Sequence, residues 1–292
     1  MDDQRRQQAI ELHDRFTHGA MPRRDFFAAM TRIAGGAAAA NLLIGSIAAS
    51  PATAAIVAAD DKRLVTGPIE WPVAGGLTMR GYQASLRPIA ERGLVLVIHE
   101  NRGLNDHIRD VARRLALAGY TAIAPDFLSP KGGTPTDADQ AREMIGKLDL
   151  GTAVADAIAT LDWFRNPFAR RTRRIAAVGF CWGGAFVNRL AVAAGTKLDA
   201  GVVYYGTAPD PAEAARVSAP LLIHLAGLDT RVNNSAFPWI TALRGAGKPV
   251  TFQLYDAVNH AFNNDTSAER YSKPAADLAW RRTLAFFARN LR

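Results

Sequence analysis

Short apolar runs alternate with amphipathic runs along most of the chain. Apolar runs of this kind are typical of strands buried on both faces of a parallel sheet, and amphipathic runs with one apolar stripe predict helices that cover the sheet. A hairpin turn is predicted first, at Gly75-Gly76. The apolar runs predict strands at residues 93–98, 120–124, 175–178, 200–205, 221–225 and 249–255. The amphipathic runs predict helices at residues 106–118, 137–147, 151–164, 184–194 and 267–291.

This order of elements predicts the class of fold. Strands that alternate with helices predict one α/β domain with a doubly wound, mostly parallel sheet. We assign residues 55–292 to this domain, and we find no internal repeat. The chain has a single cysteine, which excludes an intrachain disulfide and a metal site built from several cysteines.

The chain is basic, with a net charge of +8. Its densest cluster of arginines, Arg170-Arg171-Thr172-Arg173-Arg174, precedes a predicted strand. Ligands of such sheets bind at the carboxyl ends of strands, so this cluster belongs to the opposite face. It also contains no aromatic residue that could stack on bases. We therefore interpret the cluster as a solvated loop and expect no nucleic-acid partner.

The composition of residues 1–54 differs from that of the predicted domain. Arg23-Arg24 is followed by Phe26 and a weakly apolar run, and Ala52-Thr53-Ala54 has the small-residue pattern of a cleavage site. This order resembles a twin-arginine export signal, which is an address read by a receptor. We expect the twin-arginine export machinery as a partner of the precursor, and a periplasmic mature protein. The alternatives are an uncleaved membrane anchor and an ordinary amphipathic helix on a cytoplasmic protein.

A segment with the only cysteine, Val178-Gly-Phe-Cys-Trp-Gly-Gly184, joins a predicted strand to a predicted helix. A turn with the pattern G-x-nucleophile-x-G holds the nucleophile at its tip. Gly179 and Gly183 let the strand and helix backbones pass closely, because neither carries a Cβ. Cys181 would then lie at a helix N-terminus, where unpaired N–H groups favour a thiolate. The alternative is a buried structural cysteine between glycines that only pack.

Further residues complete a catalytic constellation. Asp229 follows the strand at 221–225 and His260 follows the last strand, and nucleophile, acid and histidine come in this order in α/β-hydrolases. His260 would take the thiol proton and later protonate the leaving group, while Asp229 would fix the imidazole tautomer. The backbone N–H groups of Trp182 and Asn101 would form an oxyanion hole.

Five motifs together resemble the dienelactone hydrolase family. They are Val97-Ile-His-Glu-Asn-Arg-Gly-Leu-Asn-Asp-His-Ile108, Ala124-Pro-Asp126, Gly179-Phe-Cys-Trp-Gly-Gly184, Gly227-Leu-Asp229 and Asn259-His-Ala-Phe262. The likeness covers residues 64–292 and implies an α/β-hydrolase fold. It also implies hydrolysis of an ester or lactone through a thioester on the cysteine, with no metal and no organic cofactor. In addition, it implies that Glu100 lies against the thiol and switches it between a resting thiol and an attacking thiolate.

The chain departs from the family pattern at the substrate site. Family members that act on dienelactone hold its carboxylate with arginines, but the matching neighbourhoods here read Phe127-Leu-Ser-Pro130 and Phe262-Asn-Asn264. Dienelactone itself is therefore not the expected substrate. His99, Arg102 and Lys131 are the candidates for lining the substrate site.

These observations predict a hydrolase that cleaves a small ester or lactone with a Cys-His-Asp triad. The spacings between the triad residues are too short for an inserted lid domain, so we expect a fairly open cleft. The alternatives are a related acyl hydrolase that acts on an amide, peptide or thioester, and a noncatalytic binding or redox-sensing protein on this scaffold. His224 is expected to be a satisfied core residue, and His13 and His18 precede the export motif.

Overall fold

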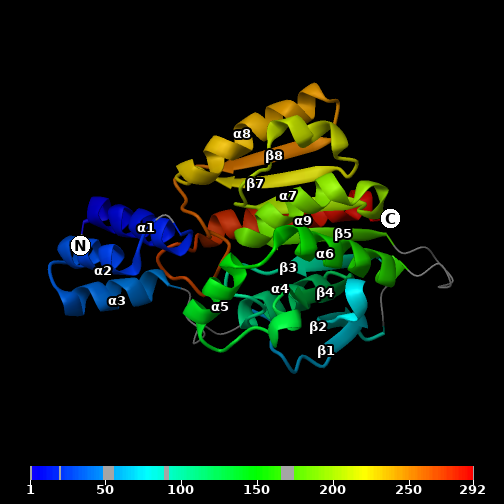
Figure 1. Cartoon of the computed structure of the whole chain (residues 1–292), viewed down its shortest axis with the longest axis horizontal. Coiled ribbons are helices and arrows are strands. Elements are labelled where there is room, and N and C mark those ends of the chain that lie inside the picture. Colours follow the sequence, from blue (N-terminus) through cyan, green and yellow to red (C-terminus); the bar gives the residue numbers. More distant parts are fainter. Residues whose placement is uncertain (1, 20, 49–55, 89–91, 166–173, 292) are drawn as a thin grey trace.

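The structure is a computed structural model that describes residues 2–19, 21–48, 56–88, 92–165 and 174–291. Figure 1 shows a central sheet with helices on both faces, and three N-terminal helices grouped at one end of the molecule. The expected cleavage motif at residues 52–54 and most of the arginine cluster at 170–174 lie outside the described residues.

The sheet confirms the predicted α/β-hydrolase fold. Its eight described strands lie in the order β1-β2-β4-β3-β5-β6-β7-β8. The pairs β1–β2 and β2–β4 are antiparallel and the other pairs are parallel, so the predicted hairpin forms one edge of a mostly parallel sheet. The strands are β1 (Leu64–Pro72), β2 (Thr78–Leu86), β3 (Leu94–Ile98), β4 (Thr121–Asp126), β5 (Ile175–Phe180), β6 (Ala200–Tyr204), β7 (Leu221–Ala226) and β8 (Val250–Tyr255).

Alternate residues of the central strands supply two hydrophobic cores, one on each face of the sheet. Val95 and Val97 of β3 pack in the core that includes residues of α4 and α9, whereas Leu96 and Ile98 pack in the core that includes residues of α6, α7 and α8. Burying one such side chain stabilises the fold by about 1.5–3 kcal/mol. The helices of this domain are α4 (Asp106–Leu117), α5 (Ala138–Gly146), α6 (Leu150–Arg165), α7 (Trp182–Ala193), α8 (Thr230–Gly245) and α9 (Lys273–Asn290).

Helix α8 is not among the elements predicted from the sequence. It contains Pro238, a residue that normally interrupts helices. Its stability comes instead from packing of its buried face, which includes Val232 and Trp239, and from an N-capping residue. That residue is Asp229, whose carboxylate accepts a hydrogen bond from the Val232 N–H at 3.2 Å. One of the predicted catalytic residues is therefore held in place by the first turn of α8.

Three helices precede the sheet: α1 (Asp3–Thr17), α2 (Arg23–Ala34) and α3 (Ala37–Ile47). The sequence indicates a segment separate from the domain, and these helices do bury an apolar cluster of their own, with Ile10, Phe26 and Met30 at its centre. They nevertheless pack against the domain beside the loops that follow β3 and β8 (Figure 1). We call α1–α3, with His18 at the end of α1, the N-terminal cap.

None of the described helices is by itself long and apolar enough to span a membrane. Helices α2 and α3 reach that length and composition only when they are taken together, and the chain bends by 104° between them. Both helices contribute side chains to the apolar cluster of the cap. The alternative of a membrane anchor stays a prediction.

The crossing of β5 and α7 sets a steric test. A Cβ on Gly179 would lie 2.0 Å from the carbonyl oxygen of Gly183. This oxygen belongs to the backbone of α7 and cannot move aside as a flexible side chain could. We expect Gly179→Ala to lower the free energy of unfolding by about 1–3 kcal/mol or more. Gly146→Ala at the end of α5 is the control, because nothing lies within 4 Å of its added Cβ. Urea unfolding measures both variants, and equal stability of the two would contradict this packing.

Candidate active site

Cys181 is the single residue between strand β5 and helix α7. Its φ of 55° lies in the left-handed region, which costs about 1–3 kcal/mol for a residue other than glycine. Its N–H donates to the carbonyl of Tyr204 on the neighbouring strand at 3.0 Å, which anchors the turn. The thiol therefore lies at the N-terminus of α7, where the first N–H groups have no intrahelical acceptor and favour a negative charge.

His260 and Asp229 lie beside this turn. Asp229 Oδ2 accepts a hydrogen bond from His260 Nδ1 at 2.5 Å, and both residues are buried. This bond places the proton of a neutral imidazole on Nδ1 and leaves the lone pair on Nε2. A ring nitrogen of His260 lies within 4.8 Å of Cys181 Sγ, and Nε2 has no hydrogen-bond partner among the described residues. The structure thus brings the three predicted catalytic residues together.

The electrostatics of the three residues favour charge separation. Burial raises the pKa of the Cys181 thiol, but the electrostatic interactions and hydrogen bonds of the thiol with His260 and His18 outweigh burial and lower this pKa to about 6. Burial lowers the pKa of His260, but the negative charges of Asp229 and Cys181 raise it well above its usual value. These shifts favour a thiolate paired with an imidazolium, which is the reactive form of a cysteine–histidine pair.

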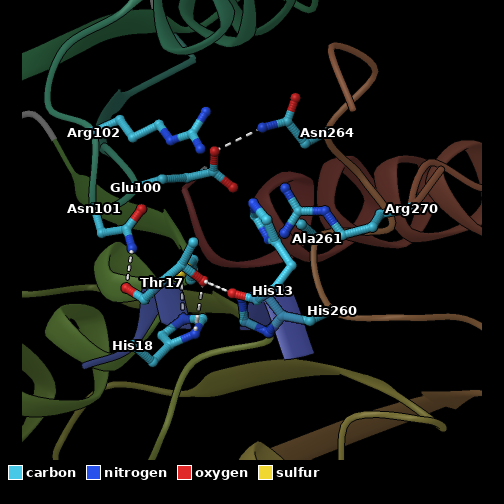
Figure 2. Close-up of a pocket in the computed structure, with 11 residues that line it drawn as sticks. His13, Thr17, His18, Glu100, Asn101, Arg102, His260, Ala261, Asn264 and Arg270 are labelled. Atoms are coloured by element: carbon cyan, nitrogen blue, oxygen red, sulfur yellow. Dashed lines mark hydrogen bonds between the residues drawn. The ribbon is translucent and has the colours of Figure 1, made fainter. Parts of the chain in front are cut away.

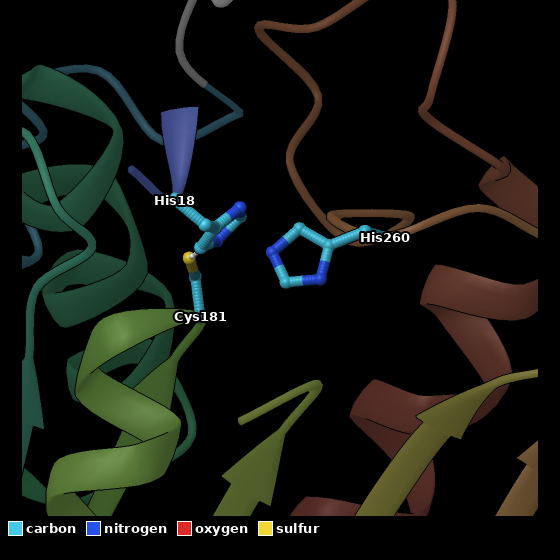
Figure 3. Close-up of side chains that lie close together, drawn as sticks. All are labelled: His18, Cys181 and His260. Carbon is cyan, nitrogen blue, oxygen red and sulfur yellow. Dashed lines mark hydrogen bonds between the residues drawn. The ribbon is translucent and has the colours of Figure 1, made fainter. Parts of the chain in front are cut away.

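His18 of the N-terminal cap is a neighbour of the thiol that the sequence did not reveal (Figure 3). Its Nε2 lies 3.3 Å from Cys181 Sγ, and its Nδ1 donates to the carbonyl of Asp14 at 2.7 Å. The rings of His18 and His260 meet edge to face at 5.0 Å. No motif marks His18, because the export-signal pattern gives no reason to bring residue 18 to residue 181.

The same three side chains have the composition of a metal site. One ring nitrogen each from His18 and His260, and the Sγ of Cys181, lie within 4.8 Å of one another. Two imidazoles and a thiolate are ligands that suit Zn²⁺. A bound metal would take the electron pair that the thiolate needs for attack, so this set does not assist acyl transfer. The expectation that the enzyme needs no metal stays a prediction.

A small cavity lies beside Cys181 (Figure 2). Its volume is about 20 Å³, which is room for about one water molecule. Among the described residues no lid domain lies between the strands, but the expected open cleft is wrong because the N-terminal cap covers it. The cavity is lined by His13, Thr17, His18, Glu100, Asn101, Arg102, Cys181, His260, Ala261, Asn264 and Arg270.

Glu100 enters this cavity from the loop after β3 and is buried. Its Oε2 accepts a hydrogen bond from Asn264 Nδ2 at 2.7 Å (Figure 2). The structure describes no hydrogen bond between this carboxylate and Cys181 Sγ. The structure therefore places Glu100 in the right cavity, and its role as a switch of the thiol stays a prediction.

The predicted oxyanion hole lies at two chain segments that meet beside Cys181. Trp182 is the first residue of α7, so its N–H has no acceptor within the helix. Asn101 lines the cavity, and its side-chain Nδ2 donates to the carbonyl oxygen of Thr17 at 3.1 Å. Stabilisation of an oxyanion by the backbone N–H groups of Trp182 and Asn101 stays a prediction.

Of the three residues predicted to line the substrate site, one lines the cavity beside Cys181. Arg102 lines the cavity. His99 is not among the residues that line the cavity: its ring is fully buried, stacks on Trp182 at 5.3 Å and donates from Nδ1 to the Glu100 carbonyl at 2.8 Å. Lys131 is exposed and is not among the residues that line the cavity.

Arg270 is a cavity residue that the sequence analysis missed. It lies between β8 and α9, further along the chain than the Phe262–Asn264 neighbourhood in which an arginine was sought. Its Nε donates to Ser267 Oγ at 2.9 Å, and its Nη1 donates to the carboxylate of Asp14 at 3.3 Å. Two guanidinium groups, those of the half-buried Arg102 and the buried Arg270, therefore line the cavity beside the thiol.

Comparison with known proteins decides the family. Residues 79–291 match the model of the Dienelactone hydrolase family. The chain belongs to this family. A protein of Escherichia coli O157:H7 named "Putative carboxymethylenebutenolidase" is 32% identical over 257 residues, which cover 82% of this chain and 93% of that protein. A crystal structure named "Putative Dienelactone Hydrolase", from Klebsiella pneumoniae subsp. pneumoniae, is 29% identical with a TM-score of 0.68, covering 77% of this chain and 98% of that chain.

The family match includes the part of the site that lies in the sheet domain and excludes the part that lies in the N-terminal cap. The matched residues include Glu100, Cys181, Asp229 and His260, all of which belong to the sheet domain. The N-terminal cap lies before the match, so the contact of His18 with the thiol is a feature of this chain that the family model does not describe.

The pKa of the thiol sets a direct test. With a pKa of about 6, alkylation of Cys181 by iodoacetamide should have its midpoint near pH 6. A free thiol has its midpoint near pH 8.5. His18→Ala and His260→Ala should each raise the midpoint, because each removes an interaction that lowers the pKa of the thiol. Intact-mass measurement reports this residue alone, since the chain has one cysteine. A wild-type midpoint near pH 8.5 would contradict the charge pair.

Proposed function

We propose that the chain hydrolyses a small ester or lactone through a thioester on Cys181, with His260 and Asp229 as its catalytic partners. The observation that carries this proposal is the 2.5 Å bond from His260 Nδ1 to Asp229 Oδ2, because it leaves the other ring nitrogen for the thiol. Membership in the dienelactone hydrolase family and the lactone-related names of the relatives support the same bond type.

The reaction begins from the thiolate and imidazolium pair. Cys181 Sγ attacks the carbonyl carbon, and the carbonyl oxygen takes a negative charge near the N–H groups of Trp182 and Asn101. The bond to the leaving oxygen then breaks, and His260 gives this oxygen the proton from Nε2, which leaves a thioester. Neutral His260 next takes a proton from water as the water oxygen attacks the thioester. The bond between Sγ and the acyl carbon then breaks, so the acid product leaves and the thiolate and imidazolium are restored.

The charges of the cavity favour an acyl group that carries a carboxylate. Arg102 and Arg270 both line the cavity, and Arg270 already binds a carboxylate, that of Asp14. An anionic substrate would form the same charge-assisted hydrogen bond. These arginines are not at the positions that family members use for dienelactone. We therefore propose an anionic ester or lactone other than dienelactone.

The triad has a direct kinetic test. Cys181→Ala and His260→Ala should each lower kcat/KM for an activated aryl ester by about a thousand-fold or more, because each removes a group that takes part in every turnover. Asp229→Asn should also lower it, since the amide cannot stabilise the imidazolium. Asp256→Asn is the matched control, because Asp256 is an exposed turn residue outside the cavity. Equal turnover by wild type and the first two variants would sink the proposal.

We also propose that the precursor is exported to the periplasm by the twin-arginine machinery. The side chains of Arg23 and Arg24, at the start of α2, are 68% and 95% exposed. A receptor can therefore reach both arginines while the cap is docked on the domain. The ion pair of Arg23 with Asp139 at 3.9 Å is largely exposed and contributes about 0–1 kcal/mol, so it would not prevent recognition.

Export has a simple cellular test. Replacing both arginines, Arg23→Lys and Arg24→Lys, should keep the protein in the cytoplasm with its N-terminus intact, because lysine does not reproduce the planar guanidinium. The wild-type protein should be found in the periplasm without residues 1–54. The exposed Arg15, replaced by lysine, is the control. Intact wild-type protein confined to the cytosol would contradict export.

A further inference from the structure

The N-terminal cap leaves no room for a substrate. Pockets that hold small molecules measure about 300–1,000 Å³, whereas the cavity beside Cys181 measures about 20 Å³. Cys181 itself is only 7% exposed. An ester large enough to react must therefore displace residues of the cap before its carbonyl carbon can reach Sγ.

The residues of the cap that enter the cleft contact groups that the proposed reaction needs. His18 Nε2 lies 3.3 Å from Cys181 Sγ. The Asp14 carboxylate accepts a hydrogen bond from Arg270 at 3.3 Å, as the carboxylate of an anionic substrate would. The carbonyl oxygen of Thr17 accepts a hydrogen bond from the Asn101 side chain at 3.1 Å. The end of α1 thus presents a carboxylate to Arg270, which would bind the carboxylate of an anionic ester, and a carbonyl oxygen to the Asn101 side chain in the same cavity.

Contacts around the rim hold the cap in this position. Gln7 Nε2 donates to Asn259 Oδ1 at 2.9 Å, beside His260 in the chain. Ser267 Oγ donates to the carbonyl of Ile47 at 2.7 Å, from the segment that carries Arg270. The guanidinium of Arg142 lies over the ring of Phe16, 4.4 Å from its centre. Most of these rim contacts are polar, so they can exchange with water when the cap leaves.

The cap is built so that it can leave as a unit. Its apolar side chains form a cluster of their own, separate from both cores of the sheet. It contributes no strand to the sheet, and the family match begins after it, at residue 79. Displacing the cap therefore opens the cleft without opening either core of the domain.

We propose that the N-terminal cap is an intramolecular inhibitor, with Asp14, Thr17 and His18 seated in the substrate cleft in place of an anionic ester. This inference rests on the proposed hydrolase function. The tethered cap is present at an effective concentration of about millimolar, so even weak docking keeps most molecules closed. The full-length chain is then latent, and removal of the cap releases its activity.

Cutting the tether in the folded protein tests the proposal. A protease site is introduced between residues 48 and 56, and the purified full-length protein is assayed before and after cleavage at submicromolar concentration. Two rates are measured: alkylation of Cys181 at pH 9, and hydrolysis of an aryl ester that carries a carboxylate. We expect both rates to rise by about ten-fold or more on cleavage, because the open fraction rises. The released cap, added back in excess, should lower both rates again.

Substitutions in the uncut chain identify the contacts that keep the N-terminal cap seated in the cleft. Asp14→Ala and His18→Ala should each raise the alkylation rate at pH 9, because each removes a contact that holds the end of α1 in the cleft. Arg24→Ala is the control, because the Arg24 side chain is 95% exposed on the outside of the cap. Its rates should equal those of the wild type. Thermal melting of each protein shows whether the domain stays folded.

The two rates separate this inference from the proposed function. Faster alkylation after cleavage, with no hydrolysis of any ester by either form, would support the cap as a cover of the thiol and contradict the hydrolase. Equal alkylation and equal hydrolysis before and after cleavage would overturn the inhibitor and leave the hydrolase intact. Loss of hydrolysis on cleavage, with the domain still folded, would also overturn the inhibitor, because the cap would then be part of the catalytic site.

Discussion

Helix α7 crosses strand β5 so closely that a Cβ on Gly179 would lie 2.0 Å from the Gly183 carbonyl oxygen, and a Cβ on Gly183 would lie 2.4 Å from the carbonyl oxygen of Ile98. This crossing forces Cys181 into a left-handed turn with a φ of 55°. It also brings the thiol to the N-terminus of α7 and against the loop after β3. The other parts of the site are arranged around a thiol whose position is set by this crossing.

The second constraint is that charges are buried around that thiol. Burial alone would keep Cys181 protonated and His260 neutral, because desolvation disfavours the charged form of each. Their mutual attraction, together with Asp229 at 2.5 Å from the imidazole, reverses both preferences. His18 adds to this reversal for the thiol, so the N-terminal cap that covers Cys181 also lowers the pKa of its thiol.

The sequence predicted those elements and site residues that local patterns mark. The order of apolar and amphipathic runs predicted the sheet, and the turn around Cys181 and the positions of Asp229 and His260 predicted residues that the fold does bring together. His224 is a satisfied core residue, as expected, with Thr283 and Tyr255 as hydrogen-bond partners.

Contacts between distant segments were beyond the reach of these patterns. His18 touches the thiol because helices α1–α3 dock as a unit, and no spacing in the chain encodes that docking. Arg270 reaches the cavity from a loop whose path depends on tertiary packing. Helix α8 was not predicted because Pro238 lies inside it. His99 follows a strand as a site residue would, yet its ring is fully buried and stacks on Trp182 instead of lining the cavity.

The central claim is that an acyl group passes through the sulfur of Cys181. The most direct measurement is the mass of the protein after acid quenching during turnover of an aryl acetate, followed by peptide mapping. The account predicts one added acetyl group on the peptide that contains Cys181, and its accumulation in His260→Ala if that variant still acylates. Rapid turnover with no acyl group on Cys181 at any time, or an acyl group on another residue, would contradict it.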